Sequence, residues 1–159
     1  MKRSLFAGAA LLAAVILPAA VNAQETIKIG VITAFSGQFA DTSAQIDNGI
    51  KLYMKQHGDK VAGKKIEIIR KDTGGPNPDV SKRLAQELVV RDKADILAGF
   101  ALTPEALGAA SVADEAKKFM VVMNAATAVI TEKSPYIVRV SLTLPMIGET
   151  LGTWAVKKG

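Results

Sequence analysis

Two threonines, Thr103 and Thr127, stand where small polar groups can bind an anion. Each follows an apolar segment typical of a β-strand, and Thr103 opens a helical stretch whose unpaired N–H groups and positive dipole end favour negative charge. Two such loops at one edge of a sheet can hold a carboxylate without a bound cation. The dipole would contribute about 0.3–2 kcal/mol, and each hydrogen bond to the charged group roughly 1.5–3 kcal/mol. Spacing alone leaves open the alternative that Thr103 only caps its helix and Thr127 only makes a turn.

The composition argues against most other chemistry. The 159 residues contain no Cys and a single His, His57, which excludes thiolate metal sites and cysteine nucleophiles and makes a histidine-based triad improbable. The glycine-rich phosphate motifs, G-x-S-x-G and H-E-x-x-H are all absent. Asp72 has the position of a phospho-acceptor or metal carboxylate, but the following Gly74-Gly75 favours a turn-stabilising role. We therefore expect no enzyme, no cofactor and no metal site.

The first 23 residues have the pattern of a secretory signal peptide. Lys2 and Arg3 precede an apolar run from Leu5 to Leu17, and small side chains lead up to Ala23. The run is shorter than the roughly 20 apolar residues that span a bilayer. We therefore expect cleavage after Ala23, export, and no membrane insertion of the mature chain.

The charge pattern gives no sign of a nucleic-acid partner. The formal net charge is +5, but two of the basic residues lie in the predicted signal peptide. The remaining basic doublets are scattered over separate element boundaries, whereas nucleic-acid binding needs a clustered basic face. Because 49% of the residues are hydrophobic, the chain can bury a core.

After residue 26 the chain alternates between short apolar runs and amphipathic stretches. Near-continuous apolar runs of four to eight residues are typical of parallel strands covered on both faces. The five predicted strands are Ile27 to Ala34, Lys65 to Lys71, Asp95 to Gly99, Phe119 to Met123 and Tyr136 to Val140.

Three helices are predicted between the strands, each with apolar residues on one face. The helix starts are indicated by Thr42 with Gln45 in capping-box spacing, by Asn77-Pro78, and by Thr103-Pro104. Strands joined by helical crossovers give an α/β fold with a doubly wound, mostly parallel sheet. In such sheets ligands bind beyond the carboxyl ends of the strands, near the topological switch point. The candidate segments are therefore residues 35–42, 72–78, 100–103 and 124–129.

Several short blocks then carry a family resemblance. They are Ile27-Lys28-Ile29-Gly30-Val31, Ser36-Gly37, Asn48-Gly49, Asp72 with Asn77-Pro78, Gly99, and Asn124-Ala125-Ala126-Thr127. In this order and spacing the chain resembles the branched-chain amino-acid family of periplasmic substrate-binding proteins, the receptor components of ABC importers. The likeness runs from about residue 25 to the end.

The resemblance implies the ligand contacts. In the family, a carboxylate is held by a hydroxyl residue that opens the third helix, which Thr103 matches here. It is also held by an amide and a hydroxyl in the loop after the fourth strand, which Ala125 and Thr127 match. A family tyrosine after the first strand aligns with Thr42. Many relatives have small polar residues where this chain has Phe100 and Leu102, which implies a less polar ligand, such as an aromatic acid.

The resemblance also implies a type I periplasmic binding fold with two lobes. Residues 24–143 would form the N-terminal ligand-binding lobe, and residues 144–159 would be the first helix of a second lobe that is largely missing from this chain. The expected function is that of a periplasmic protein delivering a small carboxylate, an amino acid or an aromatic or aliphatic acid, to a membrane permease. The alternative is a ligand-sensing receptor or regulatory module built on the same lobe.

Overall fold

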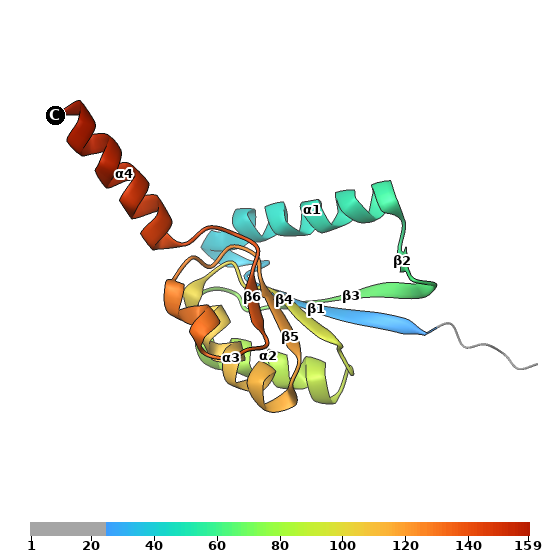
Figure 1. The fold of residues 1–159 in the computed structure, drawn as a ribbon. Coiled ribbons are helices and arrows are strands. Elements are labelled where there is room, and N and C mark those ends of the chain that lie inside the picture. Colours follow the sequence, from blue (N-terminus) through green and yellow to red (C-terminus); the bar gives the residue numbers. More distant parts are fainter. Residues whose placement is uncertain (1–24) are drawn as a thin grey trace, which may run out of the picture.

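The computed structural model describes residues 25–159, so the predicted signal peptide lies outside the described residues. Its centre is a six-stranded sheet in the order β2-β3-β1-β4-β5-β6 (Figure 1). The strands are β1 (Thr26–Thr33), β2 (Lys60–Val61), β3 (Lys64–Asp72), β4 (Ile96–Gly99), β5 (Phe119–Val122) and β6 (Ile137–Arg139). The helices are α1 (Ala40–His57), α2 (Pro78–Val90), α3 (Thr103–Ala116) and α4 (Leu144–Lys158), with short 3-10 turns η1 (Gly37–Phe39) and η2 (Ala128–Glu132).

The doubly wound α/β sheet predicted from the sequence is confirmed. Strands β3, β1, β4, β5 and β6 run parallel, and only the two-residue β2 pairs antiparallel with β3. Strand β2 was not predicted, because two exposed residues carry no periodic signal. The chain winds outward from β1 to β3 and then crosses to β4 on the other side, so the switch point lies between β1 and β4.

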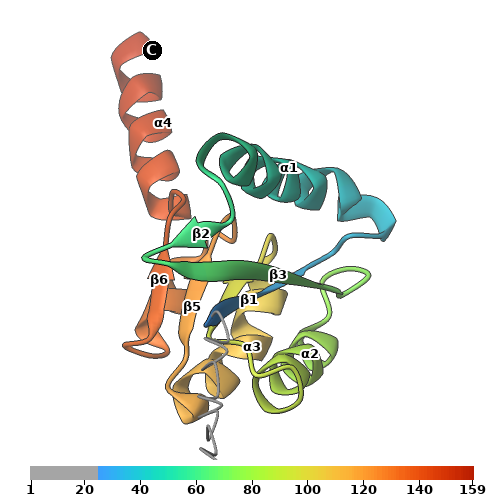
Figure 2. The same cartoon turned by 90° about the vertical axis from the view of Figure 1, so that its right-hand side faces the viewer.

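Helices α2 and α3 cover one face of the sheet and make the core with it (Figure 2). Leu88 of α2 and Leu97 of β4 are fully buried there, as are several alanines of α3. The two helices approach closely at Gly108, where an added Cβ would lie 2.2 Å from the Pro78 carbonyl oxygen. The Asn77 start signal is confirmed, because its side chain accepts a hydrogen bond from the Val80 N–H at 3.1 Å.

Helix α1 lies on the opposite face and covers it only in part (Figure 2). Its buried residues are polar: Ser43 hydrogen-bonds Thr33 at 2.9 Å, and Asp47 pairs with Arg70 of β3 at 2.6 Å. The expectation that both sheet faces are covered is therefore wrong for this face of the described residues. An apolar groove of about 310 Å³ runs between α1 and the sheet; it is lined by Ile29, Gly49, Ile50, Tyr53, Met54, Ile66, Ile68 and Met123.

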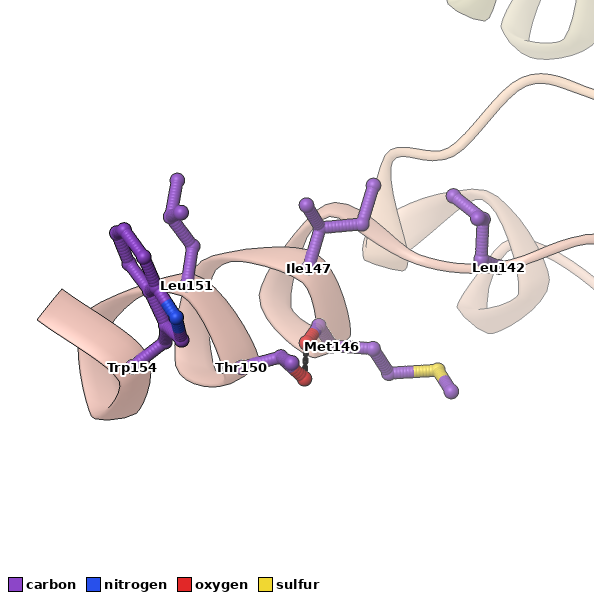
Figure 3. A pocket seen from close by; sticks show the side chains of 6 residues that line it. All are labelled: Leu142, Met146, Ile147, Thr150, Leu151 and Trp154. Atoms are coloured by element: carbon purple, nitrogen blue, oxygen red, sulfur yellow. Dashed lines mark hydrogen bonds between the residues drawn. The ribbon is translucent and has the colours of Figure 1, made fainter. Parts of the chain in front are cut away.

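Helix α4 projects away from the rest of the described chain (Figure 1). Thr143 caps it, accepting a hydrogen bond from the Met146 N–H at 3.4 Å. Its residues are all exposed, including Trp154 at 59%. Leu142, Ile147, Leu151 and Trp154 point to the same side (Figure 3). In residues 25–159, no helix combines the length and the apolar character needed to cross a bilayer.

Candidate functional site

The hydroxyl groups of Thr103 and Thr127 are hydrogen-bonded to each other, with their oxygens 2.7 Å apart. Thr103 is the first residue of α3, after β4, and Thr127 lies in the loop between β5 and η2. Strands β4 and β5 are parallel neighbours, paired as far as Gly99 with Val122, so their carboxyl ends open at the same edge of the sheet. The structure thus brings the two predicted residues together, with both side chains half-buried.

Backbone donors accompany the hydroxyl pair. Within residues 25–159, the N–H groups of Thr103 and Thr127 have no protein acceptor. Thr103 also sits at the positive end of a 14-residue helix. Two hydroxyls, two unpaired amides and a helix dipole in one place form an arrangement that can bind a carboxylate or another small anion.

Thr103 does not cap its helix, which removes one alternative left open by the sequence. The N-cap position is Leu102, whose N–H donates to the Glu105 carboxylate at 2.9 Å. Glu105 was missed by the sequence reasoning, although an acidic residue three positions after a helix start is a capping signal.

The Glu105 side chain is fully buried and joins three strand ends. It accepts a hydrogen bond from the Thr73 hydroxyl, after β3, at 2.6 Å. Burial raises the pKa of Glu105. Hydrogen bonds from the Thr73 hydroxyl and from backbone N–H groups, including that of Ala34 after β1, lower this pKa but do not outweigh the burial. Glu105 therefore links the loops after β1, β3 and β4, and its polar atoms bind groups within the protein.

Two other predicted site residues, Ala125 and Phe100, make contacts within the protein, and their contact with a ligand stays a prediction. The Ala125 N–H donates to the Phe100 carbonyl oxygen at 3.0 Å, so this amide is already paired and links the two loops instead. Phe100 has a left-handed backbone conformation, with φ of 59°, and its side chain is fully buried in the core. Its size therefore cannot set the polarity of a surface cleft, which leaves half-buried Leu102 as the apolar neighbour of Thr103.

Thr42 does not have the predicted role of a helix cap. Helix α1 is preceded by η1 and has Phe39 at its N-cap position, with no side-chain hydrogen bond, so Thr42 lies inside the first turn. The capping box with Gln45 is wrong for this reason. Thr42 is half-buried, and no hydrogen bond connects it to the threonine pair within residues 25–159.

Two polar side chains from outside the pair hold the loop after β5. The Asn124 side-chain amide donates to the Ala101 carbonyl oxygen at 2.9 Å, which ties this loop to the start of α3. Arg139, at the end of β6, donates through Nε to the Ala125 carbonyl oxygen at 3.1 Å and through Nη2 to the Thr127 carbonyl oxygen. Arg139 was not among the predicted site residues, because nothing local in the sequence links it to a loop 12 to 14 residues earlier.

Asp72 stabilises a turn, as the sequence favoured. Its carboxylate accepts hydrogen bonds from the Gly74 N–H at 2.8 Å and the Ser36 N–H at 3.2 Å, joining the loops after β3 and β1. Burial raises the pKa of Asp72, but hydrogen bonds from Ser36 and from backbone N–H groups outweigh it and hold this pKa below its ordinary value. In the part of the chain that the structure describes, no three His, Cys, Asp or Glu side chains converge on a possible metal position.

Curated proteins similar to this chain are named as Leu/Ile/Val-binding protein homologues. The Leu/Ile/Val-binding protein homolog 6 of Brucella abortus (strain 2308) is 41% identical over 143 residues, which is 90% of this chain and 37% of that protein. This chain therefore spans little more than a third of the length of the curated relatives it matches.

Solved structures extend the comparison. A solute-binding protein of an ABC transporter from Rhodopseudomonas palustris BisB5, in complex with 3,4-dihydroxybenzoic acid, is 55% identical with a TM-score of 0.82, over 84% of this chain and 37% of that one. One from R. palustris HaA2, in complex with p-hydroxybenzoic acid, is 47% identical with the same TM-score, over 85% of this chain and 37% of that one.

The names of these relatives describe binding proteins and not enzymes, which agrees with the expectation from the sequence. The resemblance stated from short blocks is also confirmed by a family model, described as periplasmic binding protein, that matches residues 26–159. Since this match covers nearly every described residue and the solved relatives share the sheet, the chain belongs to the periplasmic binding protein family.

Proposed function

We propose that this chain is the N-terminal lobe of a periplasmic solute receptor that delivers an aromatic carboxylate, of the hydroxybenzoate class, to the permease of an ABC importer. Residues 1–23 would be its signal peptide, residues 24–143 the lobe, and residues 144–159 the first helix of a second lobe. The observation that carries the proposal is the 2.7 Å contact between the Thr103 and Thr127 hydroxyls at adjoining strand ends.

The ligand carboxylate would be bound by this pair and by the N–H groups of the same two residues. Each hydrogen bond to a charged group contributes roughly 1.5–3 kcal/mol, so two or three of them account for a substantial part of a micromolar affinity, about 8 kcal/mol. The second lobe would supply the remaining contacts and would exclude water from the cleft on closure.

The choice of an aromatic acid over an amino acid is supported by two observations. The solved relatives at 55% and 47% identity are complexes with hydroxybenzoic acids. In addition, the candidate contacts after β4 and β5 are hydroxyl, amide and apolar groups, with Leu102 beside Thr103. An amino-acid ammonium needs an acidic or carbonyl partner, and Glu105, the nearest carboxylate in sequence, is fully buried among its own donors.

Thermal unfolding of the full-length protein with added solutes tests this function. A ligand that binds only the folded state stabilises it by about 2.7 kcal/mol at 100 times its Kd. We expect 4-hydroxybenzoate to raise the Tm, and the neutral 4-hydroxybenzamide and L-leucine to leave it unchanged at the same concentration. A shift with L-leucine alone would contradict the ligand class, and no shift with any carboxylate would contradict the receptor function.

A further inference from the structure

The loop that carries Thr127 is held from one side through three consecutive carbonyl groups. The Ala125 and Thr127 carbonyl oxygens accept hydrogen bonds from the Arg139 guanidinium, and the Ala126 carbonyl oxygen accepts one from the Leu144 N–H at 2.9 Å. All three donors come from residues 139–144. Rotating the loop backbone would break at least one of these three hydrogen bonds. The bonds therefore fix the orientation of the Thr127 N–H and hydroxyl.

The charge of Arg139 is not neutralised by a carboxylate. Residues 25–159 contain four arginines, and three of them form ion pairs: Arg70 with Asp47, Arg83 with Glu87, and Arg91 with Glu87 and Asp92. Within these residues no carboxylate lies within 4.0 Å of Arg139, whose hydrogen bonds are to backbone carbonyls. Arg139 is also half-buried, which lessens the screening of its charge by water.

This unpaired charge lies beside the threonine pair. The Arg139 guanidinium contacts the carbonyl of Thr127, the residue whose hydroxyl meets that of Thr103. An anion bound at the two hydroxyls would therefore have Thr127 as a neighbour in common with a fixed positive charge, and attraction between the two charges is stronger at the effective dielectric of a protein surface than in bulk water. A neutral ligand group would gain nothing from that charge.

The position of Arg139 in the chain adds a mechanical connection. It ends β6 and is followed by the segment 140–143, which leads out to the projecting helix α4 (Figure 1). Arg139 and Leu144, which flank that segment, both donate hydrogen bonds to carbonyl groups of the Thr127 loop. Displacing α4 relative to the sheet would therefore act on the same loop that carries the candidate ligand contact.

We propose that Arg139 is a specificity-determining residue for the carboxylate of the ligand. It positions the 125–127 loop with the Thr127 hydroxyl against Thr103, and it supplies the positive charge that favours an anionic ligand group there. This inference rests on the proposed function, and it adds a residue outside both candidate loops to the site.

Three variants of the full-length protein separate the charge from the packing. Arg139→Gln removes the charge, and Arg139→Lys keeps the charge but cannot span both carbonyls. Arg83→Gln is the matched control, because it removes an arginine charge from a side chain of α2 that is 65% exposed. The Kd for 4-hydroxybenzoate is measured by calorimetry, with L-leucine as the second carboxylate probe. Circular dichroism and the Tm without ligand check that each variant is folded.

We expect Arg139→Gln to weaken 4-hydroxybenzoate binding at least tenfold, Arg139→Lys to recover at least threefold of that loss, and Arg83→Gln to bind like the wild type. Equal losses for the Gln and Lys variants would overturn the charge role, and wild-type affinity in Arg139→Gln would overturn the inference altogether. If the wild type binds only L-leucine, the aromatic ligand class fails while the same comparison still tests Arg139. If the wild type binds neither acid, the proposed function and this inference are both overturned.

Discussion

The hydroxyl oxygens of Thr103 and Thr127 lie 2.7 Å apart, although 24 residues separate the two in the chain. In such a pair one hydroxyl donates to the other, and either can rotate to donate to a third group. An arriving carboxylate can therefore accept from both hydroxyls without a change of backbone. The contact places the two hydroxyls close enough together for one small anion to reach both.

Removing both hydroxyls is expected to abolish carboxylate binding. In the full-length protein, Thr103→Ala with Thr127→Ala should eliminate the rise in Tm that 4-hydroxybenzoate causes, because two charge-assisted hydrogen bonds, roughly 1.5–3 kcal/mol each, are lost. Thermal unfolding followed by fluorescence, with and without the acid, measures the effect.

Thr131→Ala is the matched control, since the Thr131 hydroxyl only returns to the Ala128 carbonyl of its own turn. This variant should keep the full ligand shift. A ligand shift that persists unchanged in the double variant would show that the carboxylate binds elsewhere.

The attachment of α1 is expected to depend on the ionised state of Asp47. Burial raises the pKa of Asp47, but its hydrogen bonds with Lys51 and Arg70 outweigh burial and hold this pKa below the ordinary value of 3.8. A lowered pKa stabilises the folded state above about pH 3.8, and this stability is lost as the pH falls through the folded-state pKa. Asp47→Asn should therefore cost about 1–3 kcal/mol at pH 7, and less in strong acid.

Denaturant titrations of the wild type and Asp47→Asn between pH 7 and pH 2.5 measure this difference. Glu115→Gln is the control for the loss of one negative charge, since Glu115 is exposed and has no ion pair in the described chain. A constant difference between Asp47→Asn and the wild type over the whole range would contradict the assignment.

The close approach of α2 and α3 predicts an unusual response at Gly108. In a helix Ala is normally more stable than Gly by about 1 kcal/mol. Here the new Cβ would lie 2.2 Å from the Pro78 carbonyl oxygen, a backbone atom, so the helices must move apart. Gly108→Ala should therefore destabilise the protein by about 1–3 kcal/mol, measured by denaturant unfolding, whereas Ser111→Ala on the exposed side of α3 should be neutral or slightly stabilising. A more stable Gly108→Ala variant would refute the packing argument.

A polypeptide of residues 24–159 alone is expected to bind 4-hydroxybenzoate far more weakly than the full-length protein. In the proposed site the Thr103 and Thr127 groups would contact the ligand from one side only, and a single wall leaves most of a small acid in water. Calorimetry should give no saturable binding below millimolar concentration. Micromolar binding by this polypeptide would mean that one lobe contains the whole site.

The elements were predictable where a local pattern signals them. The five parallel strands were each found within two residues of the expected bounds, because runs such as Phe119 to Met123 are continuously apolar. The Asn77-Pro78 helix start also held, since capping needs only neighbouring residues. The Thr42 cap failed because the 3-10 turn η1 moved the beginning of α1 upstream.

The candidate site was predictable only in outline. Its place at the carboxyl ends of β4 and β5 follows from the topology of parallel sheets. The remaining features depend on contacts between segments far apart in the chain. They are the hydrogen bond from the Ala125 N–H to the Phe100 carbonyl, the burial of Phe100, and the hydrogen bonds of Glu105 and Arg139. No local periodicity encodes such contacts.

The sequence by itself therefore determined the class of this protein: periodic apolar residues specify a parallel α/β sheet, and the order of short blocks indicates the periplasmic binding protein family. Only the tertiary structure decided which polar groups remain available to a ligand. Each donor in the loops can pair with the protein or with a solute. That choice depends on the three-dimensional packing, which turned the Ala125 N–H inward and left Thr103 and Thr127 side by side.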